Sequence, residues 1–491
     1  MKLEQLAKKL TLLETLNWKP SLEVQSVISD SRRVKQGDLF VACPGPQTDG
    51  YGHLAEAFQK GARVGVGEQP FSGSLPEGTV YLRVADAREA LGHFLNQFYD
   101  HPSKKLQLIG ITGTNGKTTI AYLLNYLLAS RRPSAYIGTL GVKTSRREEP
   151  LSNTTPGAEE LFGLLAKLVR QGIRTVAMEV SSHALDQKRV WDLQFELAIF
   201  TQLTPEHLDY HRSLENYFQA KRLLFNQPPR PKKMLINKDS PYGARLLREC
   251  PNAKSFSLKE STDYRARNVN TTFEANEFVF EGPRGQCAFR STLPFIHNVA
   301  NILSVLASLD MMGLNPADFR ESLEEFPGVP GRLEKIEANG FTVFVDYAHT
   351  PDAFEHILSE AKRLQPRRIL TLFGCGGDRD PFKRPAMTRI ACHYSDLVIL
   401  TTDNPRTEDP TQIIREMRKG LPGTTPLPNV LEITDRREAI HELLTLAEPG
   451  DVLFILGKGH EDYQILGTER VHFDDREVVR EFLKKRGRVS V

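Results

Sequence analysis

The stretch Leu106–Thr118, LQLIGITGTNGKT, decides the fold class of this 491-residue chain. Its first half is a continuous apolar run, which is typical of a strand buried in a parallel sheet. The residues that follow, TTIAYLLNYLLAS, carry apolar side chains at helical spacing. A glycine-rich turn between a buried strand and a helix is the context in which backbone N–H groups bind phosphate. We therefore predict an α/β fold with a nucleotide-binding loop in a P-loop ATPase-type parallel sheet.

The residues of this loop have distinct expected roles. Gly113 and Gly116 allow the backbone to approach a phosphate, Lys117 reaches the terminal phosphates, and the Thr118 hydroxyl binds Mg²⁺. The spacing departs from the strict G-x-x-x-x-G-K-[ST] pattern, because Ile111 stands five positions before Gly116. A plain glycine-rich turn is the alternative interpretation. We assign the nucleotide contacts to Gly113, Thr114, Asn115, Gly116, Lys117, Thr118 and Thr119.

Two further segments offer candidate metal or phosphate ligands. Glu179 follows the apolar run TVAM, and a carboxylate at a neighbouring strand end usually completes a magnesium site. A capping or surface glutamate is the alternative. In Thr201–His211, TQLTPEHLDYH, acidic and histidine side chains crowd together. A zinc site is one interpretation, but H-E-x-x-H is absent, so we favour a second-metal or phosphate role for His207.

Lys221 lies in a predicted amphipathic helix over Glu215–Phe225, ENYFQAKRLLF. Its spacing alone favours a solvated surface lysine. At the N-terminus, leucines from Leu3 to Leu16 recur at helical spacing, and we expect a packed surface helix there.

The chain divides into three blocks. Polar residues at His101–Lys105 and the Pro- and Gly-rich run Glu324–Arg332 are typical of linkers. We therefore expect domains at residues 1–102, 103–328 and 329–491. Strand–helix alternation in the second block favours a parallel sheet.

The last block contains four apolar runs that end in polar or glycine-rich tails, FTVFVDYAH, RRILTLFGCGG, DLVILTTDNPR and DVLFILGKGH. In an open parallel sheet, ligands bind beyond the carboxyl ends of the strands. The four tails therefore predict a binding site along one edge of a Rossmann-like domain.

Composition excludes several classes of protein. Lys and Arg total 64 against 61 Asp and Glu, and a net charge of +3 is too small for a dedicated nucleic-acid binder. The five cysteines are far apart and form no C-x-x-C pair, which favours a reducing compartment. No run of about 18 apolar residues occurs. We expect a cytoplasmic protein with no membrane or nucleic-acid partner.

The motifs of the chain resemble those of the Mur ligase family over nearly its whole length. The matching segments, in family order, are GTNGKT, EVSSHAL, HLDYH, YFQAKRLLF, HNVAN, PGRLE, DYAHTP and GKGHE. The tetrapeptide DNPR at 403–406 resembles the form found in members that add meso-diaminopimelate rather than lysine. The resemblance implies a three-domain enzyme that binds a uridine nucleotide, ATP and an amino acid in successive domains. We expect this enzyme to be a monomer.

The resemblance also implies site residues. The contacts to a UDP-N-acetylmuramoyl-dipeptide are Ser31, Pro46, Gln47, Thr48, Asn153, Thr154, Thr155, Ser181, Gln187 and Arg189. Further ATP contacts are Asn301, Arg332, Asp346 and His349. The diaminopimelate contacts are Arg379, Asp403, Asn404, Pro405, Arg406, Gly457 and Glu461.

For Lys221 the resemblance replaces the surface interpretation with a carbamylated lysine, whose anionic oxygens bind magnesium. It implies Thr118, Glu179, His207 and the Lys221 carbamate as metal ligands, and Lys117, Glu179, His207 and Lys221 as catalytic residues. Two positions depart from the family, because Gln202 and Glu206 stand where Asn and Asp are common. Each adds one methylene, which affects fine metal geometry.

The implied reaction belongs to peptidoglycan precursor synthesis. ATP phosphorylates the D-glutamate γ-carboxylate of UDP-N-acetylmuramoyl-L-alanyl-D-glutamate, and the amine of meso-diaminopimelate displaces phosphate to form an amide. Arg379 and Arg406 each suit a carboxylate, which lysine lacks at its distal end. The alternatives are the same reaction with L-lysine, a folylpolyglutamate-type ligase, a P-loop small-molecule kinase, and a non-catalytic nucleotide-binding relative.

Overall fold

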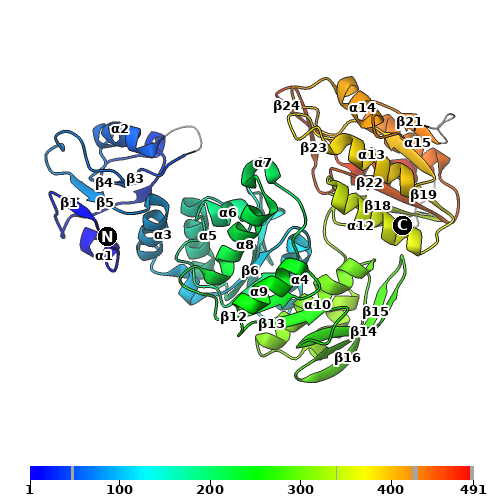
Figure 1. Cartoon of the computed structure of the whole chain (residues 1–491), viewed down its shortest axis with the longest axis horizontal. Helices are drawn as coiled ribbons and strands as arrows, with labels where there is room; N and C mark the ends of the chain where they lie inside the picture. Colours follow the sequence, from blue (N-terminus) through cyan, green and yellow to red (C-terminus); the bar gives the residue numbers. More distant parts are fainter. Residues whose placement is uncertain (46–48, 339, 422, 424–428, 487–491) are drawn as a thin grey trace. The chain divides into compact units, whose positions relative to one another are not determined.

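The computed structural model describes residues 1–45, 49–338, 340–421, 423 and 429–486. By contacts the chain forms two compact units, which are described separately. The first unit comprises Met1–Leu203 and Glu215–Phe256, and the second comprises Thr204–Leu214 and Ser257–Val491. Figure 1 labels many of their helices and strands.

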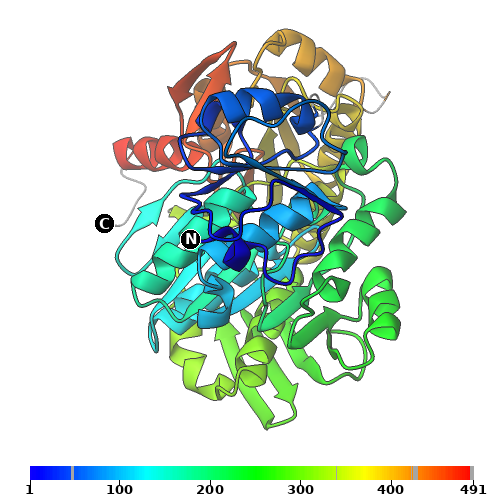
Figure 2. The ribbon, with the colours of Figure 1, turned by 90° about the vertical axis from the view of Figure 1, so that its left-hand side faces the viewer.

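The first unit begins with a small sheet in the order β1-β5-β4-β3-β2. Its strands are β1 Glu14–Leu16, β2 Val27–Ile28, β3 Leu39–Val41, β4 Val64–Gly67 and β5 Val80–Arg83, and its helices are α1 Leu3–Leu6, α2 Leu54–Gln59 and α3 Ala87–Phe98. Helix α2 contacts β4, whereas α3 contacts β2 and β3 (Figure 2). The expected N-terminal helix is wrong beyond its first turn: Leu16 pairs with Tyr81 as part of β1, so strand pairing prevails over the helical spacing.

A larger sheet in this unit carries the phosphate loop. Its strands are β6 Gln107–Thr112, β7 Ser134–Gly138, β8 Gly141–Thr144, β9 Glu148–Glu149, β10 Thr175–Glu179, β11 Leu197–Phe200, β12 Lys233–Asn237 and β13 Lys254–Ser257. The helices are α4 Lys117–Ala129, α5 Ala158–Arg170, α6 Ser182–Asp186, α8 Leu214–Asn226 and α9 Pro241–Glu249. Strands β12, β11, β6, β10 and β7 are neighbours in that order and parallel. The predicted P-loop ATPase-type sheet is confirmed.

The second unit begins with a short helix and an antiparallel meander. Its elements are α7 Leu208–His211, β14 Tyr264–Thr271, β15 Asn276–Gly282, β16 Gly285–Ser291, α10 Ile296–Met311 and α11 Arg320–Glu324. Helix α10 packs on β14 and β15, because its long apolar face is buried from Val299 to Leu309.

The rest of the second unit is a doubly wound α/β domain. Its strands are β17 Glu334–Ala338, β18 Phe341–Asp346, β19 Arg368–Phe373, β20 Leu397–Leu400, β21 Val430–Glu432 and β22 Asp451–Leu456. A hairpin of β23 Tyr463–Leu466 and β24 Glu469–His472 follows. The helices are α12 Pro351–Arg363, α13 Lys383–Tyr394, α14 Pro410–Arg418, α15 Arg436–Leu446 and α16 Asp475–Lys485.

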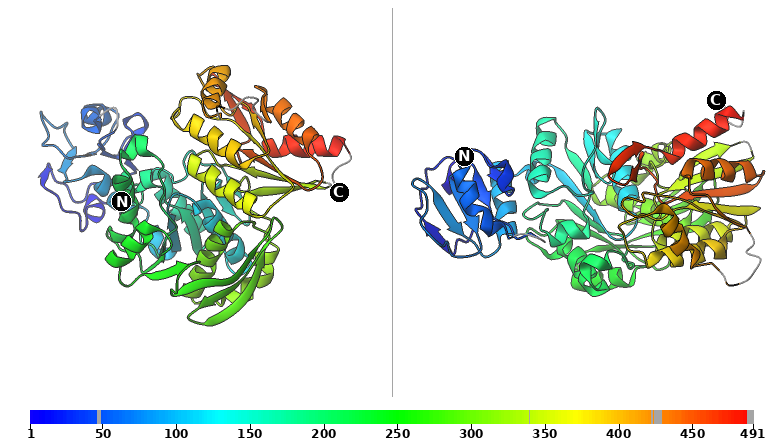
Figure 3. Two further views of the ribbon diagram at one scale, coloured as in Figure 1. Left: turned by 45° about the vertical axis from the view of Figure 1, so that its right-hand side comes forward. Right: turned by 90° about the horizontal axis from the view of Figure 1, so that it is seen from above.

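Two apolar layers cover this sheet. Helices α12, α13 and α14 pack on one face and α15 and α16 on the other (Figure 3). The strand order is β18-β22-β19-β20-β21 and all of these pairs are parallel. The carboxyl ends of β18, β19, β20 and β22 therefore lie at one edge, as the four polar tails predicted. The Rossmann-like fold is confirmed.

Candidate active site

The loop between β6 and α4 has the close backbone turn that phosphate binding requires. Gly113 and Gly116 have φ angles of 144° and 88°, which favour glycine. A Cβ on Gly113 would lie 1.9 Å from Thr201 Oγ1. The Thr201 hydroxyl itself donates to the backbone oxygen of Asn115 at 2.6 Å. The end of β11 thus fixes the loop from behind, and only glycine fits at position 113.

Two lysines converge on this loop. Lys117 Nζ donates to the backbone oxygens of Gly113 and Thr114, at 2.9 and 2.7 Å. Lys221 Nζ, on α8, donates to the Gly113 oxygen at 2.7 Å and lies 4.5 Å from the centre of the Tyr217 ring. Only 1% of Lys221 is exposed. The prediction of a solvated lysine from spacing is therefore wrong, because Lys221 shares the buried face of α8 with Tyr217 and Phe218.

Glu179, at the end of β10, lies beside the first turn of α4. Its carboxylate is buried and accepts hydrogen bonds from the Thr118 hydroxyl at 3.0 Å and the Tyr136 hydroxyl at 2.6 Å. It also accepts from the Thr139 backbone N–H and hydroxyl, at 2.9 and 3.2 Å. The structure thus brings Thr118 and Glu179 together, while their metal role stays a prediction. Thr139 was not foreseen, and its signal is the Gly-Thr pair that ends the apolar run of β7.

The side chains around the loop fit a magnesium nucleotide. Thr118 and Glu179 supply a hydroxyl and a carboxylate, and Mg²⁺ prefers oxygen ligands from one or two protein groups together with phosphates. Among the described residues, no group of three or more His, Cys, Asp or Glu side chains is arranged to hold a metal ion.

The residues expected to contact the dipeptide adjoin Glu179. Thr155 Oγ1 donates to the Glu179 backbone oxygen at 2.9 Å and accepts from the Ser181 N–H at 3.0 Å. Arg189 donates to the Thr155 backbone oxygen at 2.8 Å and to the Gln187 side chain at 2.7 and 3.1 Å. Thr139 connects the Glu179 carboxylate with the residues predicted to contact the dipeptide, because its hydroxyl also lies 3.1 Å from Thr154 Oγ1.

Other residues predicted for the UDP-dipeptide are spread more widely. Asn153 is exposed and donates to Ser152. Ser31 is buried and donates to Glu56 at 3.1 Å. The three residues of the predicted diphosphate turn, Pro46, Gln47 and Thr48, lie outside the described residues.

His207 belongs to the second unit, where it precedes α7 with φ of 56° and lies 3.8 Å from the Glu206 carboxylate. Its predicted metal role stays a prediction.

A second set of predicted ATP contacts lies near the end of β18. The Asp346 carboxylate accepts from the backbone N–H groups of Leu333 and Ala348, both at 2.7 Å, and burial raises its pKa. The Arg332 guanidinium stacks on Tyr347 at 4.7 Å. His349 Nδ1 lies 2.8 Å from the Tyr347 backbone oxygen, and burial lowers its pKa. Asn301, on α10, donates to Asn298 at 3.0 Å.

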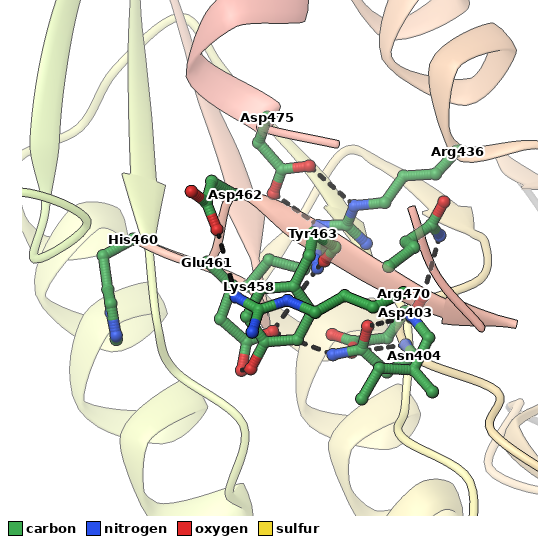
Figure 4. A network of polar contacts seen from close by, with 12 residues as sticks. Asp403, Asn404, Arg436, Lys458, His460, Glu461, Asp462, Tyr463, Arg470 and Asp475 are labelled. Atoms are coloured by element: carbon green, nitrogen blue, oxygen red, sulfur yellow. Dashed lines mark hydrogen bonds and ion pairs between the residues drawn. The ribbon is translucent and has the colours of Figure 1, made fainter. Parts of the chain in front are cut away.

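Most residues predicted for diaminopimelate gather beyond β20 and β22, and Figure 4 shows several of them. Asn404 Nδ2 donates to Glu461 Oε2 at 2.8 Å, and Asn404 Oδ1 accepts from the Ile465 N–H at 3.0 Å. Gly457 has φ of 114°, and a Cβ there would lie 2.7 Å from the Asp403 carboxylate. We call Asp403, Asn404, Arg406, Gly457 and Glu461 the amino-acid site, after the ligand predicted for it.

Arg406 is fixed by both its backbone and its side chain. Its φ is 52°, its N–H donates to the Ile465 oxygen at 3.0 Å, and its guanidinium donates to the Gly377 oxygen at 2.7 Å. Gly377 also packs on Pro405, whose backbone oxygen would lie 1.8 Å from a Cβ at position 377. Arg379, on the same loop as Gly377, is exposed.

The amino-acid site combines anionic and cationic groups. Burial and the Asp403 carboxylate raise the pKa of Glu461 above its usual range, although the Lys458 ammonium, 3.4 Å away, opposes this effect. Lys458 is fully buried and was not predicted; its only signal is its place in GKGHE. Burial and Arg332 lower the pKa of His460 to about 3, so this imidazole is neutral at physiological pH.

The first unit has a phosphate loop with a buried carboxylate beside it, and the second unit has an ion-rich site in a Rossmann-like domain. Both features are typical of enzymes that use ATP. Three family models match the chain, one after another. They are the Mur ligase family, catalytic domain, at residues 23–99, the Mur ligase middle domain at 111–309, and the Mur ligase, glutamate ligase domain, at 331–459. The chain belongs to the Mur ligase family and is an ATP-dependent ligase.

Named relatives match over almost the whole chain. A UDP-N-acetylmuramoyl-L-alanyl-D-glutamate–2,6-diaminopimelate ligase of Thermosynechococcus vestitus is 43% identical over 94% of each chain. One of Gloeobacter violaceus is 40% identical over 99% of each. A solved structure of a protein with the same name is 31% identical, with a TM-score of 0.73 and full coverage of both chains.

Two further structural findings concern the helices and the cysteines. None of the helices in the described part of the chain has the length and apolar character that a bilayer crossing needs. All five cysteines lie among the described residues and carry free thiols.

Proposed function

We propose that this chain joins meso-diaminopimelate to the D-glutamate γ-carboxylate of UDP-N-acetylmuramoyl-L-alanyl-D-glutamate in peptidoglycan precursor synthesis. ATP activates the carboxylate as an acyl phosphate, and the amine then displaces phosphate. The names of the relatives support this substrate pair.

The observation that carries the proposal is the charge pattern of the amino-acid site. Diaminopimelate has an ammonium and a carboxylate at each end. The Asp403 and Glu461 carboxylates suit an ammonium, whereas the Arg406 guanidinium suits a carboxylate in a bidentate pair. Lysine would leave Arg406 without its anion, and an unpaired polar group at a binding site can reject the wrong ligand by about 10⁴-fold. The site therefore favours diaminopimelate over lysine.

The phosphoryl step brings a carboxylate to a polyanion, so the site must offset negative charge. Lys117 and the N–H groups of the loop would bind the phosphates. Magnesium, when bound, would neutralise the developing charge on the phosphates. We assign its ligands to Thr118, Glu179, His207 and Lys221 as its carbamate, and further ATP contacts to Asn301, Arg332, Asp346 and His349.

The same proposal covers the wider organisation. Residues 1–102 would bind the uridine nucleotide, 103–328 ATP, and 329–491 the amino acid, in a cytoplasmic monomer. Ser31 and the residues from Asn153 to Arg189 assigned above would bind the UDP-dipeptide.

Phosphate release from ATP tests the function. The assay contains the UDP-dipeptide and either meso-diaminopimelate or L-lysine, and mass spectrometry detects the amide. We expect phosphate and amide with diaminopimelate only. Turnover with lysine at a similar kcat/KM would overturn the assignment of the amino acid. Formation of ADP and a stable phosphorylated product, without free phosphate or amide, would favour a kinase.

A further inference from the structure

Arg436 connects the two strand tails that carry the amino-acid site. It is the first residue of α15, and its side chain is completely buried. Its guanidinium donates to the backbone oxygens of Thr402 and Leu456, both at 3.1 Å. Thr402 directly precedes Asp403, and Leu456 directly precedes Gly457. One side chain therefore holds both tails at the point where the site begins.

Strand pairing does not provide this connection. In the sheet, β19 lies between β20 and β22, so no backbone ladder links the two strands that lead into the tails. Beyond the strand ends, Asn404 contacts Glu461 at 2.8 Å. A small shift of one tail would separate these groups, and a misplacement of about 1 Å can cost 10²-fold in rate.

Asp475 orients the Arg436 guanidinium. The first residue of α16, it accepts from Arg436 Nε at 2.8 Å and from Nη2 at 2.7 Å, and its side chain is also fully buried (Figure 4). This bidentate pair uses one edge of the planar fork and leaves the remaining N–H groups for the two backbone oxygens. A lysine has no such fork.

Stability alone gives little reason for this pair. Two buried charges lose their hydration, and replacing such a pair by apolar residues of similar size is often neutral or stabilising. We infer that Arg436, oriented by Asp475, is a positioning residue for the amino-acid site, which sets the separation between the Asp403–Asn404 tail and the Gly457–Glu461 tail. This inference rests on the proposed function of that site.

The double variant Arg436→Met/Asp475→Leu tests the inference, because it removes both charges while it keeps the volume apolar. We expect a folded protein whose thermal midpoint is lowered by the loss of the two hydrogen bonds to the Thr402 and Leu456 oxygens, and a KM for meso-diaminopimelate at least 10-fold higher. The KM values for ATP and the UDP-dipeptide should stay within about twofold, because the pair touches neither of their predicted sites.

A matched control lies at the opposite edge of the same sheet. Arg368 forms a bidentate pair with the buried Asp451, at 2.6 and 3.1 Å, at the amino ends of β19 and β22. Arg368→Met/Asp451→Leu should leave all three KM values unchanged. An unchanged diaminopimelate KM in the folded Arg436 variant would overturn the inference, as would an equal rise in all three KM values.

A single substitution covers the case in which the double variant does not fold. Arg436→Lys keeps the charge but loses the fork, and we expect the same selective rise in KM; no rise would overturn the inference. The wild type measured in parallel distinguishes a failure of the positioning role from a failure of the proposed function. If it forms no amide with diaminopimelate, the proposed substrate fails, and the KM comparison is made with the amino acid that the wild type accepts.

Discussion

Lys117 and Lys221 donate to the same acceptor, the backbone oxygen of Gly113, at 2.9 and 2.7 Å. Two ammonium groups around one carbonyl oxygen repel each other. Carbamylation of Lys221 would replace one cation by an anion beside the phosphate loop. We therefore expect Lys221→Arg, which cannot form a carbamate, to lower kcat by about 10²–10³-fold.

Carbon dioxide provides an independent measurement of the carbamate. Wild-type phosphate release should fall in CO₂-free buffer and recover on addition of bicarbonate, whereas Lys221→Arg should respond to neither change. Lys232→Arg is the control, because Lys232 is 62% exposed and pairs with Glu196. Full activity of Lys221→Arg would contradict the carbamate.

The raised pKa of Glu461 predicts a pH dependence of amino-acid binding. Burial and the Asp403 carboxylate raise this pKa, so Glu461 takes up a proton at a higher pH than free glutamate does. The ionised form is the one that attracts an ammonium. Below the pKa of Glu461, KM for diaminopimelate should therefore rise by up to about tenfold for each unit by which the pH falls. Above this pKa, KM should be constant.

The control for this pH dependence is the neutral isostere. Glu461→Gln should show a raised KM for diaminopimelate that changes less with pH, while KM for ATP follows the wild-type pH profile. If the pH dependence of the diaminopimelate KM is the same in Glu461→Gln as in the wild type, another group is responsible.

Much of the fold could be predicted because its signals are local. Apolar runs predicted the strands β6, β18, β19, β20 and β22. The polar tails at four strand ends predicted the edge of the sheet at which the amino-acid site lies. Family motifs supplied most of the assigned site residues. The helical spacing of the N-terminal leucines was misleading, since a three-residue strand was stabilised by pairing with β5, which lies more than 60 residues away in the chain.

Residues that act through distant partners could not be predicted from local spacing. Spacing placed Lys221 on the surface, because the acceptor of its hydrogen bond lies 108 residues earlier. Thr139 meets Glu179 across 40 residues, and Arg436 meets Asp475 across 39. In each case the sequence shows one ordinary polar residue, and only the fold supplies the partner that gives it a role.

The phosphate loop predicts a sharp effect of adding one methyl group. Gly113→Ala would bring a Cβ to 1.9 Å from Thr201 Oγ1 in a backbone conformation with φ of 144°. We expect at least a 10-fold loss of ATP affinity by calorimetry. Gly285→Ala is the matched control, because φ is 120° there and no atom lies within 4 Å of the added Cβ. Gly285→Ala therefore introduces backbone strain without a steric clash, and it should bind ATP with the affinity of the wild type. Equal affinities of both variants would show that the close packing at Gly113 is not required.

Lys188 links the dipeptide residues to the start of α3, and its loss should affect one substrate selectively. It lies between Gln187 and Arg189, and its Nζ donates to Asp86 and Glu89 of the segment that begins α3, both at 2.6 Å.

Both carboxylates raise the pKa of Lys188, although partial burial opposes them, so the ion pairs persist at neutral pH. We expect Lys188→Ala to raise KM for the UDP-dipeptide by about tenfold, because the 187–189 turn loses its anchor, with KM for diaminopimelate unchanged. Lys188→Arg should restore most of the affinity. Lys105→Ala, which breaks an exposed pair with Asp100, should behave like the wild type. A uniform fall in kcat with all KM values unchanged would instead assign Lys188 a role in stability.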